Sequence, residues 1–401
     1  MIPVREESLR AWCEVRGDAL RANVATLRSR LAPEALLGVV VKSDAYGHGL
    51  VLCAREFIAA GADWLIVNSL AEAVRLRRAG LTAPVYICAQ VAPFEASIAV
   101  ESGARVVLCD RNSARALAAA AHQHGTVLSC HIKLETGTHR QGIAPEDLLE
   151  YARWVEGLEG LKIEGLTTHF ADIEDTADRG FAQEQMRILS AAAETLRAGG
   201  LDIPMVHAAN SAAALLWPET HGSLVRVGIA AYGLWPSDTL REVAEERLPL
   251  PPRLCPALSW KARIAQVKTV PEGGTIGYGR TFRAPKPMRI GIVPVGYYEG
   301  YDRRMSNRGH VLIDGARAPV RGRVCMNMFM IDLADAPEAQ PGQVVTLLGS
   351  EGEEEVGADR WASWMDSIHY EAVSRIHPEQ PRLLRAEDGL LYLAEDAKAY
   401  E

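Results

Sequence analysis

A lysine directly follows a short apolar run near the start of the chain. Residues 37–41 read Leu-Gly-Val-Val-Val, Lys42 comes next, and a turn of sequence Tyr46-Gly-His-Gly49 follows. The run shows no polar alternation, which predicts a fully buried strand over residues 36–42. A lysine at a strand end most often reaches solvent. In a partly buried position, however, its neutral amine can attack an aldehyde, so Lys42 is the first candidate for chemistry.

Polar residues also follow several later apolar runs. The clearest are Lys133, His169, Asn210 with Ser211, and Arg226. Together with Lys42 they mark the ends of five separate predicted strands. In a barrel of parallel strands the catalytic groups gather at the carboxyl ends of the strands. We therefore expect these side chains to share one site.

The elements that would position these residues alternate between strands and helices. We predict strands over residues 36–42, 63–69, 84–89, 105–110, 127–134, 163–170, 205–210 and 224–229. Stretches of helical spacing lie between them. Eight alternations in this length predict a closed (β/α)₈ barrel of the TIM type. An open doubly wound sheet is the alternative, but no GxGxxG motif follows the first strand.

The pattern changes after residue 240. Residues 241–256 are charged and proline-rich, and we interpret them as a linker. Beyond them come short β-type runs separated by Gly and Pro, which predict a C-terminal all-β domain. The expected division is a barrel over residues 15–245 and a β-strand domain over 250–390, with residues 1–14 joining the second domain.

Composition narrows the class of protein. The 401 residues are 48% hydrophobic and 23% charged, with a net charge of −8. The sequence contains no stripe of basic residues of the kind that would predict nucleic-acid binding. It also contains no apolar run long enough to predict a membrane span. Residues 1–10 lack an apolar signal core and the cysteines form no CxxC pair, so we expect a cytoplasmic protein. We predict no metal site, and we expect His122, His124 and His131 at the surface or behind the site.

Several motifs resemble those of one enzyme family. The segment Val40-Val-Lys42-x-x-Ala-Tyr46-Gly-His-Gly49 closely resembles the pyridoxal-phosphate attachment segment of bacterial alanine racemases. Further matching segments come in the family order between residues 10 and 385. The resemblance implies pyridoxal 5'-phosphate as the cofactor and Lys42 as the lysine that attaches to it. The implied cofactor-binding residues are Lys42, Tyr46, Arg140, His169, Ser211, Arg226, Gly228, Ile229 and Tyr370.

Two basic residues acquire particular roles from this resemblance. Arg140 would approach both the cofactor and the substrate carboxylate, which its guanidinium can hold at two points. Lys133 matches a lysine that is carbamylated in some members, where the resulting anion would hold Arg140. An ordinary salt bridge between Lys133 and Glu135 or another acid is the alternative.

Arg226 bears on the type of reaction. The resemblance implies that it faces the pyridine nitrogen of the cofactor. Most other pyridoxal-phosphate enzymes place a carboxylate there, which keeps that nitrogen protonated and makes a strong electron sink. Because an arginine has no proton to give at physiological pH, the sink would be weak. A weak sink favours quick return of a proton over transamination or decarboxylation.

The C-terminal half would supply the second base. Gly274-Thr-Ile-Gly-Tyr278-Gly closely matches the catalytic tyrosine segment of the family. Lys42 and Tyr278 would then act on opposite faces of the substrate, with His169 assisting the tyrosine. Met326 would contact the substrate carboxylate. The implied substrate entrance consists of Tyr297, Arg303, Arg323 and Ile368. The sequence departs from the family at Asn327, where an aspartate is usual.

The resemblance therefore implies racemisation of L- and D-alanine for peptidoglycan precursors by a homodimer with shared active sites. A broader serine and alanine racemase is an alternative. A barrel-type amino-acid decarboxylase would want an acid in place of Arg226 and a catalytic cysteine in the second domain. A non-enzymatic pyridoxal-phosphate carrier would not need the domain that holds Tyr278.

Overall fold

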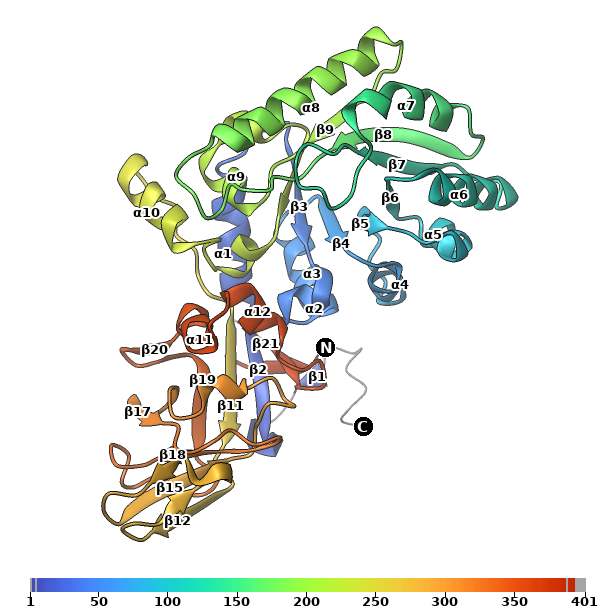
Figure 1. The fold of residues 1–401 in the computed structure, drawn as a ribbon. Coiled ribbons are helices and arrows are strands. Elements are labelled where there is room, and N and C mark those ends of the chain that lie inside the picture. The colour runs from blue at the N-terminus through green and yellow to red at the C-terminus, as the bar shows by residue number, and fades with distance from the viewer. Residues whose placement is uncertain (1, 4–5, 387–388, 394–401) are drawn as a thin grey trace. The chain divides into compact units, whose positions relative to one another are not determined.

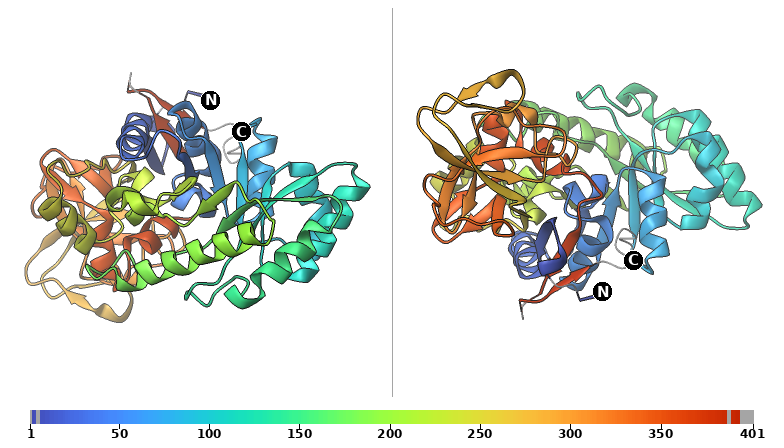
Figure 2. Two further views of the ribbon diagram at one scale, coloured as in Figure 1. Left: turned by 90° about the horizontal axis from the view of Figure 1, so that it is seen from above. Right: turned by 90° about the horizontal axis from the view of Figure 1, so that it is seen from below.

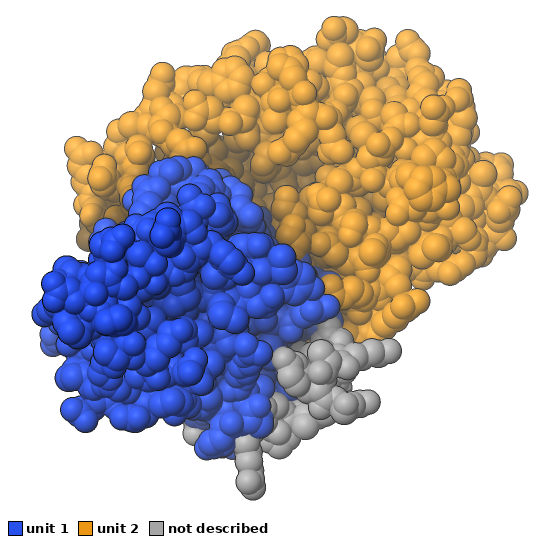
Figure 3. Space-filling model, turned by 60° about the horizontal axis from the view of Figure 1, so that its bottom comes forward, with its two compact units in different colours: residues 1–18, 44–52, 256–401 blue, residues 19–43, 53–255 orange. Residues whose placement is uncertain are grey.

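The computed structural model describes residues 2–3, 6–386 and 389–393. They form two compact units, shown in different colours in Figure 3. The first combines residues 1–18, 44–52 and 256–401 and is called the strand unit below. The second combines residues 19–43 and 53–255 and is called the barrel unit.

Eight parallel strands form the centre of the barrel unit (Figure 1). In sheet order they are β10 (Leu224–Val227), β3 (Leu36–Val40), β4 (Trp64–Val67), β5 (Val85–Gln90), β6 (Arg105–Leu108), β7 (Leu128–Lys133), β8 (Leu161–Thr167) and β9 (Met205–His207). Backbone hydrogen bonds from Ser223 to Val206 and from Arg226 to Ala209 join β10 to β9 and complete the ring. The predicted (β/α)₈ barrel is confirmed.

Apolar strands and capped helices explain why this sequence builds a barrel. Every residue of β4 and β10 is buried, as expected for parallel strands covered on both faces. The helices are α1 (Gly17–Arg28), α3 (Leu50–Ala59), α4 (Leu70–Arg78), α5 (Ala96–Ser102), α6 (Arg111–Gln123), α7 (Leu148–Glu156), α8 (Gly180–Ala198), α9 (Ser211–Leu216) and α10 (Asp238–Arg247). Ser69, Asp110 and Asn210 cap α4, α6 and α9 through their side-chain oxygens. Helices α4 to α7 flank the outer side of the strands (Figure 2).

The segment after β3 forms one turn of left-handed helix, α2 (Lys42–Tyr46). Its residues Ser43 to Tyr46 all have φ between 53° and 55°. At one end the Ser43 N–H donates to Glu72 at 2.6 Å. At the other end Gly47, with φ +81°, lies against the backbone of Val373, where a Cβ would come within 2.1 Å of the carbonyl oxygen. Only glycine fits that position.

The strand unit contains a mostly antiparallel sheet of nine strands. The order is β1 (Ile2–Pro3), β22 (Leu391–Leu393), β21 (Arg382–Arg385), β2 (Ala11–Arg16), β11 (Leu258–Arg263), β19 (Val344–Glu351), β16 (His310–Ile313) and β17 (Ala316–Pro319), with β20 (Glu354–Val356) paired to β19. The first residues of the chain therefore pair with the C-terminal strands. The exact domain limits expected from the sequence stay a prediction.

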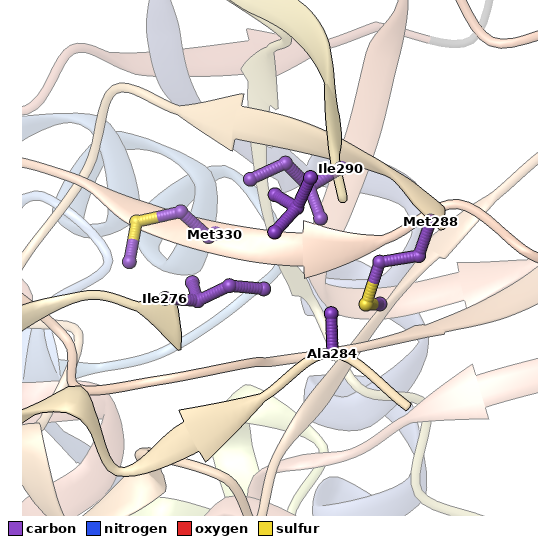
Figure 4. Close-up of a cluster of buried hydrophobic side chains, with 6 residues drawn as sticks. Ile276, Ala284, Met288, Ile290 and Met330 are labelled. Atoms are coloured by element: carbon purple, nitrogen blue, oxygen red, sulfur yellow. The ribbon is translucent and has the colours of Figure 1, made fainter. Parts of the chain in front are cut away.

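A smaller β structure in the same unit positions Tyr278. Strands β12 (Gln266–Val270), β15 (Met288–Val293) and β18 (Phe329–Asp332) form a three-stranded sheet, and β13 (Thr275–Ile276) pairs with β14 (Phe282–Arg283). Figure 4 shows the apolar cluster between them, which includes Ile276, Ala284, Met288, Ile290 and Met330. Tyr278 lies in the tight turn between β13 and β14, so this cluster anchors it.

The structure corrects three expectations. The strand predicted over residues 36–42 ends at Val40, because the left-handed turn begins at Lys42. Residues 241–247 of the expected linker belong to α10, whose first turn is capped by Ser237. The C-terminal domain consists mostly of strands, as expected, but it also contains two short helices, α11 (Ala358–Met365) and α12 (His369–Ser374).

Candidate active site

Cationic side chains gather around His169 in the barrel unit. Burial holds the pKa of this histidine well below its usual range, and nearby positive charges lower it further. Those charges belong to Arg226, Lys133, Arg140 and Lys42. Four of the residues predicted at strand ends therefore lie close enough to interact electrostatically, namely Lys42, Lys133, His169 and Arg226. Arg140 lies with them. Such a concentration of positive charge suits an anionic ligand.

Lys133 lies in an environment that strongly disfavours its charge. Burial, followed by the charges of Arg226 and Arg140, lowers the pKa of Lys133 to about 7. The charge of Glu135 acts in the opposite direction but is outweighed. A large fraction of this amine is therefore neutral at physiological pH. Glu135 accepts a backbone hydrogen bond from Gly137, which directs its carboxylate into the following turn.

Arg226 is buried and held in one orientation. Its Nη2 donates to the carbonyls of Thr168 at 2.8 Å and Ala208 at 2.9 Å, while its Nη1 lies 2.5 Å from Nδ1 of His207. Within the described part of the chain, Arg226 has no carboxylate among its hydrogen-bond partners. The guanidinium thus keeps its positive charge facing neutral acceptors.

Ser211, Gly228 and Ile229 come together between two strand ends. Ser211 is the first residue of α9, and its hydroxyl accepts hydrogen bonds from the Gly228 N–H at 2.9 Å and the Ala230 N–H at 3.4 Å. Ile229 begins the short helix η5 (Ile229–Tyr232), where a backbone N–H has no partner within its own helix. The arrangement brings one hydroxyl and the N–H groups of residues 228–230 together, and those of Gly228 and Ala230 donate to Ser211. Groups of this kind at a helix start bind anions.

The other predicted residues lie in the strand unit. Tyr46 and Tyr370 come from distant parts of the chain, yet their ring centroids lie 6.2 Å apart. Tyr370 is in the first turn of α12 (His369–Ser374), two residues after Ile368, which is 60% exposed. The two rings therefore lie near each other, as expected if both residues contact the same ligand group.

Tyr278 and Met326 border a cavity of about 600 Å³ within the strand unit. Both side chains are largely exposed, Tyr278 to 73% and Met326 to 55%. A Cβ added to Gly279 would lie 3.1 Å from Nη1 of Arg323, so this guanidinium lies against the turn that carries Tyr278. These three predicted residues are thus neighbours on one exposed surface.

Two hydrogen-bonded loops carry the remaining candidates. The Tyr297 N–H donates to the Cys325 carbonyl at 3.1 Å, which ties the loop of Tyr297 to the loop of Met326. Arg303 begins the short helix η7 (Arg303–Met305), and the next residue after that helix, Ser306, accepts a hydrogen bond from Val324. The unusual residue Asn327 donates from Nδ2 to the Glu299 carboxylate at 2.7 Å. Asn327 therefore joins the same two loops.

Sequence reasoning assigned no role to the groups behind Arg226. His207 directly contacts its guanidinium, and His131 contacts His207. Of the three histidines expected at the surface or behind the site, His122 and His124 are exposed and His131 is fully buried. The position of His131 two residues before Lys133 is the signal that could have found it, because alternate residues of a strand share one face.

Of the helices in the described ranges, none combines the length and apolar character that a bilayer crossing requires.

The fold and the grouped residues define a barrel enzyme with its chemistry at the carboxyl ends of the strands. Two family descriptions match this chain: "Alanine racemase, N-terminal domain" over residues 15–236 and "Alanine racemase, C-terminal domain" over residues 257–384. The chain belongs to the alanine racemase family.

Individual relatives agree over nearly the whole chain. An alanine racemase of Desulfovibrio desulfuricans is 38% identical over 372 residues, which cover 93% of this chain and 97% of that protein. One of Syntrophobacter fumaroxidans is 40% identical, with coverage of 90% and 94%. The crystal structure of alanine racemase from Bacillus anthracis with bound L-Ala-P superposes with a TM-score of 0.89 at 32% identity, and covers 96% of this chain and 97% of that one.

Proposed function

We propose that this protein interconverts L- and D-alanine with pyridoxal 5'-phosphate, and that Lys42 and Tyr278 act as the two bases. The observation that carries the proposal is the environment of Arg226. Its guanidinium is buried, has neutral hydrogen-bond partners and lies at the barrel end that also holds Lys42. A guanidinium beside the cofactor nitrogen would give a weak electron sink, which favours racemisation over decarboxylation or transamination. Supply of D-alanine for peptidoglycan is the metabolic role that we propose for it.

The side chains of the barrel unit fit this cofactor. Lys42 would attach to the cofactor. The cations near His169 would bind its phenolic oxygen and the substrate carboxylate. The Ser211 hydroxyl and the Gly228 and Ile229 N–H groups would bind its phosphate. We assign Tyr46 and Tyr370 to the same phosphate. When bound, the cofactor makes the α-proton of an amino acid acidic.

The protein's own groups then have defined tasks. The Arg140 guanidinium binds and orients the substrate carboxylate. One base removes the α-proton from one face, and the other returns its own proton to the opposite face, so configuration inverts without net proton loss. Lys42 serves the face of D-alanine and Tyr278 that of L-alanine. Arg303, Arg323, Tyr297 and Ile368 would line the entrance, and Met326 would contact the substrate through its backbone.

The decarboxylase alternative fits the structure less well. It would require a reactive cysteine in the strand unit, where Cys325 lines the cavity beside Tyr278. Burial raises the pKa of the Cys325 thiol, which reduces the fraction of reactive thiolate at neutral pH. Together with Arg226 at the ring-nitrogen position, this favours racemisation.

The direct test is incubation of the protein and cofactor with L-alanine, followed by chiral analysis of the product. We expect D-alanine to accumulate until both enantiomers are equal. A parallel assay with serine measures substrate breadth. Release of carbon dioxide without D-alanine, or no turnover by cofactor-loaded protein, would contradict the proposal.

We further propose a homodimer in which each site takes Lys42 from one chain and Tyr278 from the other. The large exposed fraction of Tyr278 supports this, since a catalytic phenol requires an enclosed site that its own unit does not provide. Lys42→Ala and Tyr278→Phe proteins should each be nearly inactive. After they are mixed, unfolded and refolded in equal amounts, half of the dimers are mixed, and about a quarter of all sites should be intact.

Recovery to that level would support sharing. If mixed dimers form, as shown by differently tagged chains, and no activity returns, both bases belong to the same chain.

A further inference from the structure

A continuous series of polar contacts runs through the barrel interior to Arg226. Arg105 donates to both oxygens of Glu164, from Nε at 2.7 Å and from Nη2 at 3.2 Å. Glu164 Oε2 lies 3.2 Å from Nε2 of His131. His131 Nδ1 lies 2.8 Å from Nε2 of His207, and His207 Nδ1 lies 2.5 Å from Arg226. The series starts at the first residue of β6 and ends near the carboxyl ends of β9 and β10.

The two histidines in the middle of the series are buried and neutral. His131 is 0% exposed and His207 is 1% exposed. Tyr86 packs against both rings, with centroid distances of 4.9 Å and 5.9 Å, and Trp64 packs edge-on against His131. Burial lowers the pKa of both imidazoles. A neutral imidazole has one donor and one acceptor nitrogen, so each ring must adopt one of two tautomers.

Glu164 determines which tautomer is favoured. Burial alone would raise the pKa of Glu164, but hydrogen bonds from His131 and Arg105 outweigh it and lower the pKa to about 2. An ionised carboxylate only accepts hydrogen bonds. His131 must therefore carry its proton on Nε2, which leaves Nδ1 as an acceptor. That acceptor in turn requires the proton of His207 to be on Nε2, so Nδ1 of His207 is bare.

The bare Nδ1 of His207 is the partner that Arg226 needs. The guanidinium is a donor only, so a protonated Nδ1 would place two donors face to face across 2.5 Å. Thr167 can donate its hydroxyl to the same nitrogen at 3.1 Å. All hydrogen bonds in the series are satisfied when both histidines are Nε2–H tautomers. In the reverse arrangement two are lost, the one between His131 and Glu164 and the one between His207 and Arg226.

We propose that Glu164 is a positioning residue that fixes the tautomers of His131 and His207 and thereby holds the Arg226 guanidinium in place. The effect on catalysis rests on the function proposed above, because it assumes that Arg226 faces the cofactor ring. The effect on the histidines does not depend on that assumption.

Gly165 independently shows that the place of His131 is built into the sequence. A Cβ at position 165 would lie 2.3 Å from Nδ1 of His131. The ladder between β7 and β8 also shifts register between Cys130 and His131, directly opposite this glycine. The absence of a side chain at Gly165 thus leaves the space that the His131 ring occupies, next to the atom that accepts from His207.

The first experiment reads the tautomers by ¹⁵N NMR of histidine-labelled protein, without and with cofactor, with signals assigned through His131→Gln and His207→Gln variants. We expect Nε2–H for both rings in the wild-type protein. In Glu164→Gln the amide can donate as well as accept, so we expect a mixture of tautomers at both rings. Glu164→Asp keeps an anion and should retain the wild-type pattern. A wild-type His207 protonated on Nδ1, or an unchanged pattern in Glu164→Gln, would overturn the proposal.

The second experiment measures alanine racemisation by the same holoenzymes. We expect Glu164→Gln to lower kcat roughly tenfold with little change in KM, by analogy with the loss found when the partner of a metal-binding histidine is removed. Glu164→Asp should recover most of that loss. Gly165→Ala, which displaces His131, should resemble Glu164→Gln in both the tautomer pattern and kcat.

An inactive wild-type holoenzyme would refute the proposed function while the tautomer result still stands. An active wild type with the expected tautomers, but an unchanged kcat in Glu164→Gln, would overturn the action of Glu164 through Arg226.

Discussion

The candidate residues of the barrel unit and those of the strand unit sit in opposite environments. Arg226 and Lys133 have perturbed pKa values caused first by burial, and His169 shares this environment. In the strand unit, Tyr278 and Ile368 are 73% and 60% exposed. Arg226, Lys133 and His169 are thus desolvated within their own unit, whereas Tyr278 and Ile368 still face solvent. Electrostatic groups act most strongly when preorganised and dry, so the exposed position of Tyr278 is the part of the comparison that the proposed shared site addresses.

The largest expected effect is in the barrel unit. Lys42→Ala should abolish covalent attachment of the cofactor and lower kcat by about 10³-fold or more, because it removes both an attachment point and a base. Absorbance of the bound cofactor and a racemisation assay measure the two losses. Lys162→Ala, which changes an exposed lysine of β8, is the matched control and should behave as wild type. An attached cofactor in Lys42→Ala would place the attachment elsewhere.

Tyr278→Phe tests the strand unit and should have the next largest effect. Removal of a general base lowers rates by roughly 10²- to 10⁴-fold, and we expect a greater loss for proton removal from L-alanine than from D-alanine. Hydrogen–deuterium exchange at the α-carbon of each enantiomer measures this. Thermal stability should not change because the side chain is exposed. Tyr298→Phe, at an exposed tyrosine stacked on His377, is the control. Equal losses for both enantiomers would argue against a face-specific base.

The carbamylation of Lys133 should depend on pH. With its pKa lowered to about 7, the amine is mostly neutral above pH 7 and increasingly protonated below it. Only the neutral amine adds carbon dioxide, so we expect a carbamate at pH 8 that diminishes as the pH falls through 7. ¹³C NMR with labelled bicarbonate should show the signal in wild type and not in Lys133→Met. Its absence from wild-type protein at pH 8 would favour the salt-bridge alternative.

Asn327→Asp should have the smallest effect. It would replace the hydrogen bond to Glu299 with two neighbouring carboxylates and loosen the loops of Tyr297 and Met326. Because the pair is exposed, we expect a loss of only about 0.5–1 kcal/mol in the free energy of unfolding. Denaturant unfolding measures it. In a double-mutant cycle, adding Glu299→Gln should restore the lost free energy of unfolding. If the effects of the two substitutions on that free energy simply add, the two residues are not coupled.

Local patterns predicted the barrel well because each strand and helix carries its own signal. The segments 36–42 and 224–229 are mostly apolar and carry a polar residue near the strand end, so the strands could be predicted, while the place of the site stays a prediction. The helix α10 was missed because charged residues dominate it and proline follows closely. The partners of Arg226 were missed for another reason. The link from Glu164 through His131 to His207 depends on contacts across β7, β8 and β9, and no spacing within one segment reports such contacts.

The left-handed turn after β3 has a consequence for which substitutions this segment tolerates. Left-handed backbone costs an L-residue roughly 1–2 kcal/mol at each position, and glycine far less. At Ser43 the usual ranking of helix residues is therefore inverted: glycine should be the most acceptable replacement and valine or isoleucine the worst. At Asp44 asparagine should rank first, because it tolerates this backbone and keeps an acceptor for the Leu50 N–H. A library of variants at these two positions should recover small, flexible residues, although the segment is hydrogen-bonded as a helix.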